Sequence, residues 1–116
     1  MVVEEIVMHH LDKDQLAELK EVLEDEFDVL INTYLKDAEF RLALIQDGLD
    51  TQNCEAVRLA AHILKGASAN VGATILTSLC EQLEHDCKIK QYTSLHNIFA
   101  KTTIEFSHVK RSLQVF

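Results

Sequence analysis

The chain has 116 residues, of which 47% are hydrophobic and 26% charged, and its net charge is -8. This length allows one hydrophobic core, and we expect residues 1–116 to form a single domain. The negative charge argues against binding to nucleic acid or to an anionic membrane, because both select basic surfaces. The absence of proline and the presence of only three glycines favour long helices over turns and strands.

The N-terminus and the cysteines indicate the cellular compartment. Residues 1–8 contain an acidic pair where a secretory signal carries positive charge, and their apolar run is too short to span a bilayer. The three cysteines, Cys54, Cys80 and Cys87, include no C-x-x-C pair, so neither a disulfide framework nor a zinc site is predicted. We therefore expect a cytoplasmic protein with no bound metal.

The first predicted element is a short helix that begins at Asp12. Asp12 and Gln15 form an N-terminal capping pattern, followed by an apolar stripe of Leu16, Leu19 and Leu23. The second helix is predicted from an apolar stripe with helical spacing, which consists of Phe27, Leu30, Ile31, Tyr34, Ala38, Leu42, Ile45 and Leu49. Residues 48–53 are expected to break this helix, and Asn53 is expected to cap the next one.

Three further helices follow. The third ends near Asn70 and Gly72, which tolerate the left-handed conformation of a helix terminus. The fourth has an apolar face of Leu76, Leu79, Cys80, Leu83 and Cys87, and the last has one of Leu95, Ile98, Phe99, Thr102, Phe106, Val109 and Leu113. Helices of matched length with short connections predict an all-α fold: an up-down-up-down antiparallel four-helix bundle with a short additional N-terminal helix.

The third helix has two distinct faces. Its apolar face consists of Val57, Ala60, Leu64, Ala67 and Val71, and its other face of Glu55, Arg58, His62, Lys65, Gly66 and Ala69. The imidazole of His62 should therefore point outward. Gly66 costs about 1 kcal/mol relative to alanine in a helix, and we attribute it to clearance, because a large partner must reach the imidazole. Arg58 and Lys65 form a small basic spot that can stabilise phosphate charge, although an ordinary solvated helix face remains an alternative.

The segment from His62 to Gly72, with the sequence HILKGASANVG, resembles the signature of histidine-containing phosphotransfer (HPt) domains. These four-helix bundles relay phosphate between aspartates of receiver domains. The resemblance implies that His62 is the phosphoacceptor, Lys65 its charge partner and Gly66 the clearance residue. Ser68 and Gly72 belong to the helix-end part of the motif.

The resemblance also implies the partners. A free-standing HPt protein accepts the phosphoryl group from the receiver of a hybrid sensor histidine kinase and passes it to the receiver of a response regulator. The partner receiver brings Mg²⁺ and most catalytic groups, so this chain is expected to be a carrier without a cofactor of its own rather than an enzyme. Leu59 and Ala69 are the expected docking residues.

The sequence departs from the family pattern at two positions. A serine often follows the glycine in this family, whereas Ala67 follows Gly66 here. A glutamine on the following helix orients the histidine in some members, and the matching position here is Glu84, with Gln82 two residues earlier. A glutamate there would repel incoming phosphate. Further docking candidates on the second helix are Phe27, Tyr34 and Leu35. A core role is favoured for Phe27 and Tyr34.

Two other functions remain open at this stage. A di-iron bundle needs two Glu-x-x-His motifs, and only Glu105 to His108 supplies one. A helical interaction module that binds receiver domains without phosphotransfer has the same helical periodicity. The combination of His62, Lys65 and Gly66 favours phosphotransfer over both, and the polar outer faces favour a monomer.

Overall fold

The computed structural model describes residues 10–116, all of which belong to helices or to short connections between them. The prediction that residues 1–8 are not a secretory signal concerns residues outside this range. The helices are α2 (Lys13–Leu23), α3 (Glu26–Asp50), α4 (Cys54–Asn70), α5 (Thr74–Lys88) and α6 (Tyr92–Val115). No strand occurs among the described residues, which confirms the all-α class. None of the helices among residues 10–116 combines the length and the hydrophobicity that a membrane-spanning segment requires.

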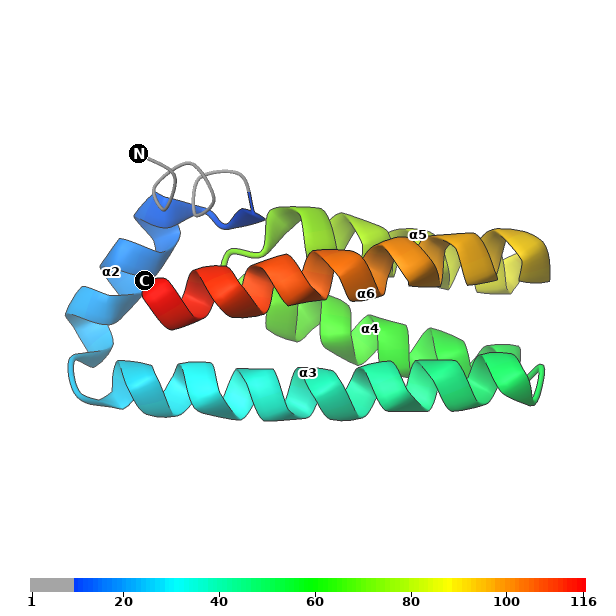
Figure 1. The fold of residues 1–116 in the computed structure, drawn as a ribbon, viewed down its shortest axis with the longest axis horizontal. Helices are drawn as coiled ribbons and strands as arrows, with labels where there is room; N and C mark the ends of the chain where they lie inside the picture. Colours follow the sequence, from blue (N-terminus) through cyan, green and yellow to red (C-terminus); the bar gives the residue numbers. More distant parts are fainter. Residues whose placement is uncertain (1–9) are drawn as a thin grey trace.

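The four long helices α3 to α6 lie side by side, and the chain reverses direction at each connection between them (Figure 1). Helix α3 packs against α4 and α6, and α5 packs against the same two helices, so the four enclose a common core. The short α2 lies across one end and contacts α3.

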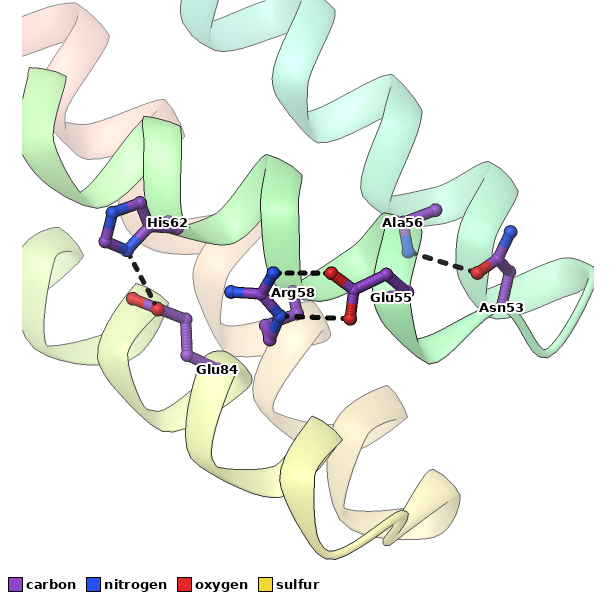
Figure 2. A network of polar contacts seen from close by, with 6 residues as sticks. All are labelled: Asn53, Glu55, Ala56, Arg58, His62 and Glu84. Atoms are coloured by element: carbon purple, nitrogen blue, oxygen red, sulfur yellow. Dashed lines mark hydrogen bonds and ion pairs between the residues drawn. The ribbon is translucent and has the colours of Figure 1, made fainter.

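Two helix starts follow the predicted capping residues. The Asp12 carboxylate accepts a hydrogen bond from the backbone N–H of Gln15 at 3.1 Å, and this bond caps α2. The Asn53 side chain accepts one from Ala56 N–H at the same distance and caps α4 (Figure 2). Each bond satisfies a backbone donor that has no partner within its helix. Both predicted capping residues are confirmed. The Gln15 side chain, however, donates to the Ala69 carbonyl at 2.8 Å and does not complete a capping box with Asp12.

The predicted apolar stripes point inward and form one core. Its buried members include Leu16, Phe27, Ile31, Tyr34, Ala38, Ile45, Leu49, Val57, Leu64, Val71, Leu76, Cys80, Leu83, Cys87, Leu95, Ile98, Phe99, Thr102, Phe106, Val109 and Leu113. Leu30 and Leu42, which the stripe of the second helix included, are only half-buried. Leu35 was a docking candidate, but it is buried with Phe27 and Tyr34, because α3 is covered on two sides by α4 and α6.

The break predicted at residues 48–53 was placed too early, because α3 continues to Asp50. Gly48 is helical and buried, and it permits close approach to the start of α4: a Cβ there would lie 2.7 Å from Val57 Cγ2. Gly48 is thus a packing residue rather than a helix breaker.

Replacing Gly48 by alanine should lower the free energy of unfolding by about 1 kcal/mol or more, because Val57 must move to admit the methyl group. Gly66→Ala is the matched control, since nothing lies within 4 Å of a Cβ at that helical glycine. This control should gain about 1 kcal/mol from helix propensity. Urea unfolding followed by circular dichroism measures both, and equal shifts of the same sign would contradict the packing role.

Candidate functional site

His62 lies in the middle of α4 and points away from the core. Val57, Ala60 and Leu64 on the opposite face of the helix are buried, and this orientation leaves 58% of the His62 side chain exposed. The predicted outward direction is confirmed. The hydrophobic burial that directs one face of α4 inward therefore presents the imidazole to solvent.

Glu84 on α5 contacts His62 directly. Its Oε2 lies 3.0 Å from His62 Nδ1 (Figure 2), and its Oε1 lies 2.6 Å from Lys65 Nζ. Only 14% of the Glu84 side chain is exposed, so the carboxylate bridges α5 to two residues of α4 from a sheltered position. Gln82 is exposed on the same helix. The structure therefore places Glu84, not Gln82, beside the histidine.

The protonation of this cluster follows from its contacts. Partial burial opposes ionisation of Glu84, but the hydrogen bonds from Lys65 and His62 outweigh it and hold the Glu84 pKa below its ordinary value. The hydrogen bond to Glu84 raises the pKa of Lys65. An ionised carboxylate only accepts hydrogen bonds, so we assign the proton of this contact to Nδ1 of His62. In the neutral ring, Nε2 then carries the free lone pair, and Figure 2 shows this nitrogen directed away from Glu84.

Replacing Glu84 by glutamine should lower the free energy of unfolding by about 1 kcal/mol at neutral pH. The folded-state pKa of Glu84 is lowered, so its contribution is fully present above the unfolded pKa and is lost as the pH falls through the folded value. The difference between variant and wild type should therefore disappear in acid. Urea unfolding at several pH values measures it, with the exposed Glu81→Gln on the same helix as control. A difference that persists in acid would contradict the ionic contact.

The surface around His62 is open. Gly66 is exposed, and nothing lies within 4 Å of a Cβ built on it. Ala69 is also exposed, and Leu59, three residues before His62, is 52% exposed. All three lie on α4. The arrangement leaves room for a large body to approach the ring.

Arg58 lies one turn before His62 but faces a different partner. Its guanidinium forms an ion pair with Glu55, with Nε 3.2 Å from Oε2 (Figure 2). This pairing raises the pKa of Arg58 and lowers that of Glu55. Lys65, by contrast, shares Glu84 with the histidine. The predicted basic spot thus divides into one lysine in the His62 cluster and one arginine beside it.

Ser68 and Gly72 lie at the helix end and not on the His62 face. Ser68 is fully buried, and its Oγ lies 2.8 Å from the Tyr34 hydroxyl on α3. Gly72 has a φ of 74°, the left-handed conformation that glycine adopts at low cost. Its carbonyl accepts a hydrogen bond from Asp12 N–H at 2.7 Å. These residues therefore anchor the end of α4 to α3 and to the start of α2.

The Glu-x-x-His motif of α6 serves a structural contact. The buried Glu105 has its Oε2 2.8 Å from His10 Nδ1, and the His10 ring stacks on His108 with the centroids 4.6 Å apart. Among residues 10–116, no group of three or more histidine, cysteine, aspartate or glutamate side chains is arranged to hold a metal ion. The described residues therefore offer no support for a di-iron centre.

One family model and two curated proteins have sequences similar to this chain. A family model described as "Hpt domain" matches residues 29–110. Multistep phosphorelay regulator 1 of Schizosaccharomyces pombe is 30% identical over 80 residues, which are 68% of this chain but only 27% of that protein. Histidine-containing phosphotransfer protein 2 of Arabidopsis thaliana is 28% identical over 108 residues, which cover 87% of this chain and 69% of that protein.

Solved structures agree with the sequence matches. Histidine-containing phosphotransfer protein B (HptB) from Pseudomonas aeruginosa PAO1 has a TM-score of 0.87 and 34% identity, with 90% of this chain and 91% of that chain covered. The maize histidine-containing phosphotransfer protein ZmHP2 also has a TM-score of 0.87, with 97% and 93% covered. Its identity is 22%, so it supports the fold alone.

Proposed function

Because the chain belongs to the Hpt domain family, we propose that His62 accepts a phosphoryl group from a receiver-domain aspartate and passes it to the aspartate of a second receiver. A role in a histidine phosphorelay follows from family membership. The donor is the receiver of a hybrid sensor histidine kinase, and the acceptor is the receiver of a response regulator. The chain acts as a monomeric carrier, built as an up-down-up-down four-helix bundle, and not as an autonomous enzyme.

One observation carries this assignment: the His62 ring is held through Nδ1 while Nε2 faces open space. The contact with Glu84 at 3.0 Å occupies Nδ1, and the empty surroundings of Gly66 leave room for a partner. A nucleophile that is oriented before the partner arrives loses less freedom when the complex forms. This geometry supports Nε2 as the phosphorylated atom.

The transfer step uses few groups of this chain. The Nε2 lone pair attacks the phosphorus of the aspartyl phosphate, the Nε2–P bond forms, and the P–O bond to the aspartate breaks. The aspartate leaves as a carboxylate with the bonding electrons. The imidazole gains positive charge as Nε2 donates its electrons, and the ionised Glu84 beside Nδ1 stabilises that charge. Reversal of the step on a second receiver completes the relay.

Lys65 and Arg58 are proposed to stabilise phosphate charge. Lys65 Nζ neutralises Glu84 Oε1 at 2.6 Å, and this contact reduces the repulsion between the carboxylate and an incoming phosphoryl group. Arg58 lies one helical turn before His62 and is already paired with Glu55, so its contribution requires exchange of that partner. Lys65 is the stronger candidate, because its partner Glu84 also contacts His62.

The partner receiver supplies the remaining parts of the site. We assign Mg²⁺ to the receiver, where it would stabilise the charge on the transferred group. Leu59 and Ala69 on α4 are the docking residues of this chain, since both are exposed next to the histidine. Gly66 provides clearance between them.

The decisive experiment incubates the protein with a receiver domain that carries a labelled aspartyl phosphate. Label should appear on this chain, and phosphorus NMR should report a phosphohistidine substituted at Nε2 of His62. Binding of the receiver without transfer of label would instead identify an interaction module. Label on an exposed histidine of another helix, such as His85 or His96, would also contradict the assignment.

A further inference from the structure

A cavity of about 630 Å³ lies at the end of the molecule where α3 connects to α4. In Figure 1 this end of the ribbon is opposite α2. Its walls come from the connection between α3 and α4, from the end of α5 and from the start of α6. Two of the three cysteines, Cys54 and Cys87, line it. The phosphotransfer site uses neither thiol.

The two thiols lie together. Cys54 is the first residue of α4 and half-buried. Cys87, near the end of α5, is 4% exposed, and its thiol interacts with that of Cys54. The Cys54 thiol donates to the Tyr92 hydroxyl at 3.1 Å, and that hydroxyl donates to the Gln52 carbonyl at 3.1 Å. These contacts hold the Cys54 sulfur at the cavity wall. Cys54 is therefore the more accessible of the two thiols.

Cationic side chains outnumber carboxylates in the lining of the cavity. Three cationic side chains line it, Arg58, Lys88 and Lys90, against the single carboxylate of Glu55. Arg58 is paired with Glu55, whereas both lysines are exposed and have no ion-pair partner among residues 10–116. This local positive charge occurs on a chain whose net charge is -8. Such a cavity concentrates small anions.

We propose that Cys54 and Cys87 are a redox-active thiol pair, which an anionic low-molecular-weight disulfide such as oxidised glutathione converts to an intramolecular disulfide. Cys54 loses its proton, its sulfur attacks one sulfur of the oxidant, and the first glutathione leaves as a thiolate that takes up a proton. Cys87 then loses its proton and attacks the Cys54 sulfur of the mixed disulfide, and the second glutathione leaves in the same way. Both cysteines are oxidised, and the oxidant is reduced to two thiols.

The two cysteines have different roles in this scheme. Cys87 is 4% exposed, so an external oxidant does not reach its thiol, and burial also raises the pKa of this thiol to about 12. It acts only once the mixed disulfide on Cys54 presents an electrophilic sulfur within its reach. Cys80 is fully buried, and burial likewise raises its pKa to about 12, so it serves as an internal control.

The proposal is tested by incubating the reduced 116-residue protein with oxidised glutathione. The intact mass should fall by two hydrogen atoms, and peptide mapping should join Cys54 to Cys87 while Cys80 remains free. Cys87→Ser should stop at one glutathione adduct on Cys54, and Cys54→Ser should remain unmodified. A disulfide that includes Cys80, a wild-type reaction that stops at the adduct, or an unreactive Cys54 overturns the pair.

A charge test separates recognition from simple thiol reactivity. Lys88→Gln/Lys90→Gln should react several-fold more slowly than wild type with oxidised glutathione, but at the wild-type rate with the neutral hydroxyethyl disulfide. Equal slowing with both oxidants would contradict recognition of the anion. The His62→Gln variant should be oxidised at the wild-type rate, so the outcome does not depend on phosphotransfer. Thermal unfolding of each variant confirms that it is folded.

Discussion

Replacing His62 by glutamine is expected to reduce phosphoryl uptake from a phosphorylated receiver to background. The substitution removes the only nucleophilic nitrogen that the proposed step uses, while the amide remains similar in size. Because 58% of the His62 side chain is exposed, the free energy of unfolding should change by less than about 0.5 kcal/mol. Transfer of labelled phosphate and urea unfolding measure the two effects separately.

His96→Gln is the matched control for this variant. His96 is also exposed, but it lies on α6 and takes no part in the contacts that join His62, Lys65 and Glu84. This control should accept phosphate at the wild-type rate. Retention of label by His62→Gln, or its loss in His96→Gln, would refute the assignment of the phosphoacceptor.

Replacing Gly66 by leucine is expected to stabilise the protein and to slow phosphotransfer. No atom lies within 4 Å of a Cβ at this position. The Cβ of leucine therefore has room, and we expect a gain of about 0.8 kcal/mol from helix propensity. The same side chain occupies the space through which a receiver reaches Nε2. A small displacement of reacting groups costs roughly 10²-fold in rate, and we expect a loss of that order.

Gly66→Ala separates the two effects. Alanine gives a similar gain in stability but adds only a methyl group, so its transfer rate should lie between those of wild type and Gly66→Leu. Single-turnover transfer from a phosphorylated receiver gives the rates, and urea unfolding gives the stabilities. A leucine variant that transfers at the wild-type rate would show that Gly66 does not provide clearance.

Several features of the fold were predictable because they depend on residues close together in the chain. The caps at Asp12 and Asn53 involve a backbone N–H three residues later. The outward direction of His62 follows from the buried stripe of its own helix. Helical spacing and capping are local properties, so the amino-acid order is enough to reveal them.

The two wrong predictions, a helix break at Gly48 and a docking role for Leu35, both concern residues at contacts between helices. Gly48 suggested a helix break, but Val57 on the next helix explains it, because only glycine allows the two helices to approach so closely. Leu35 lies at the edge of the stripe on α3 and is buried because α3 contacts both α4 and α6. The apolar pattern of one helix does not reveal where the neighbouring helices pack against it.

The candidate site likewise combines features that follow from local sequence and features that depend on helix packing. The sequence alone determined the helix, the exposed histidine, and the lysine and glycine on its face, since spacings of three and four residues place them together. Only the tertiary structure decided that Glu84 holds Nδ1 of that histidine and Nζ of Lys65, and that Arg58 pairs with Glu55. Glu84 is 22 residues from His62, so their contact depends on the register in which α5 packs against α4. That register is set by burial of the core and is not encoded in any local spacing.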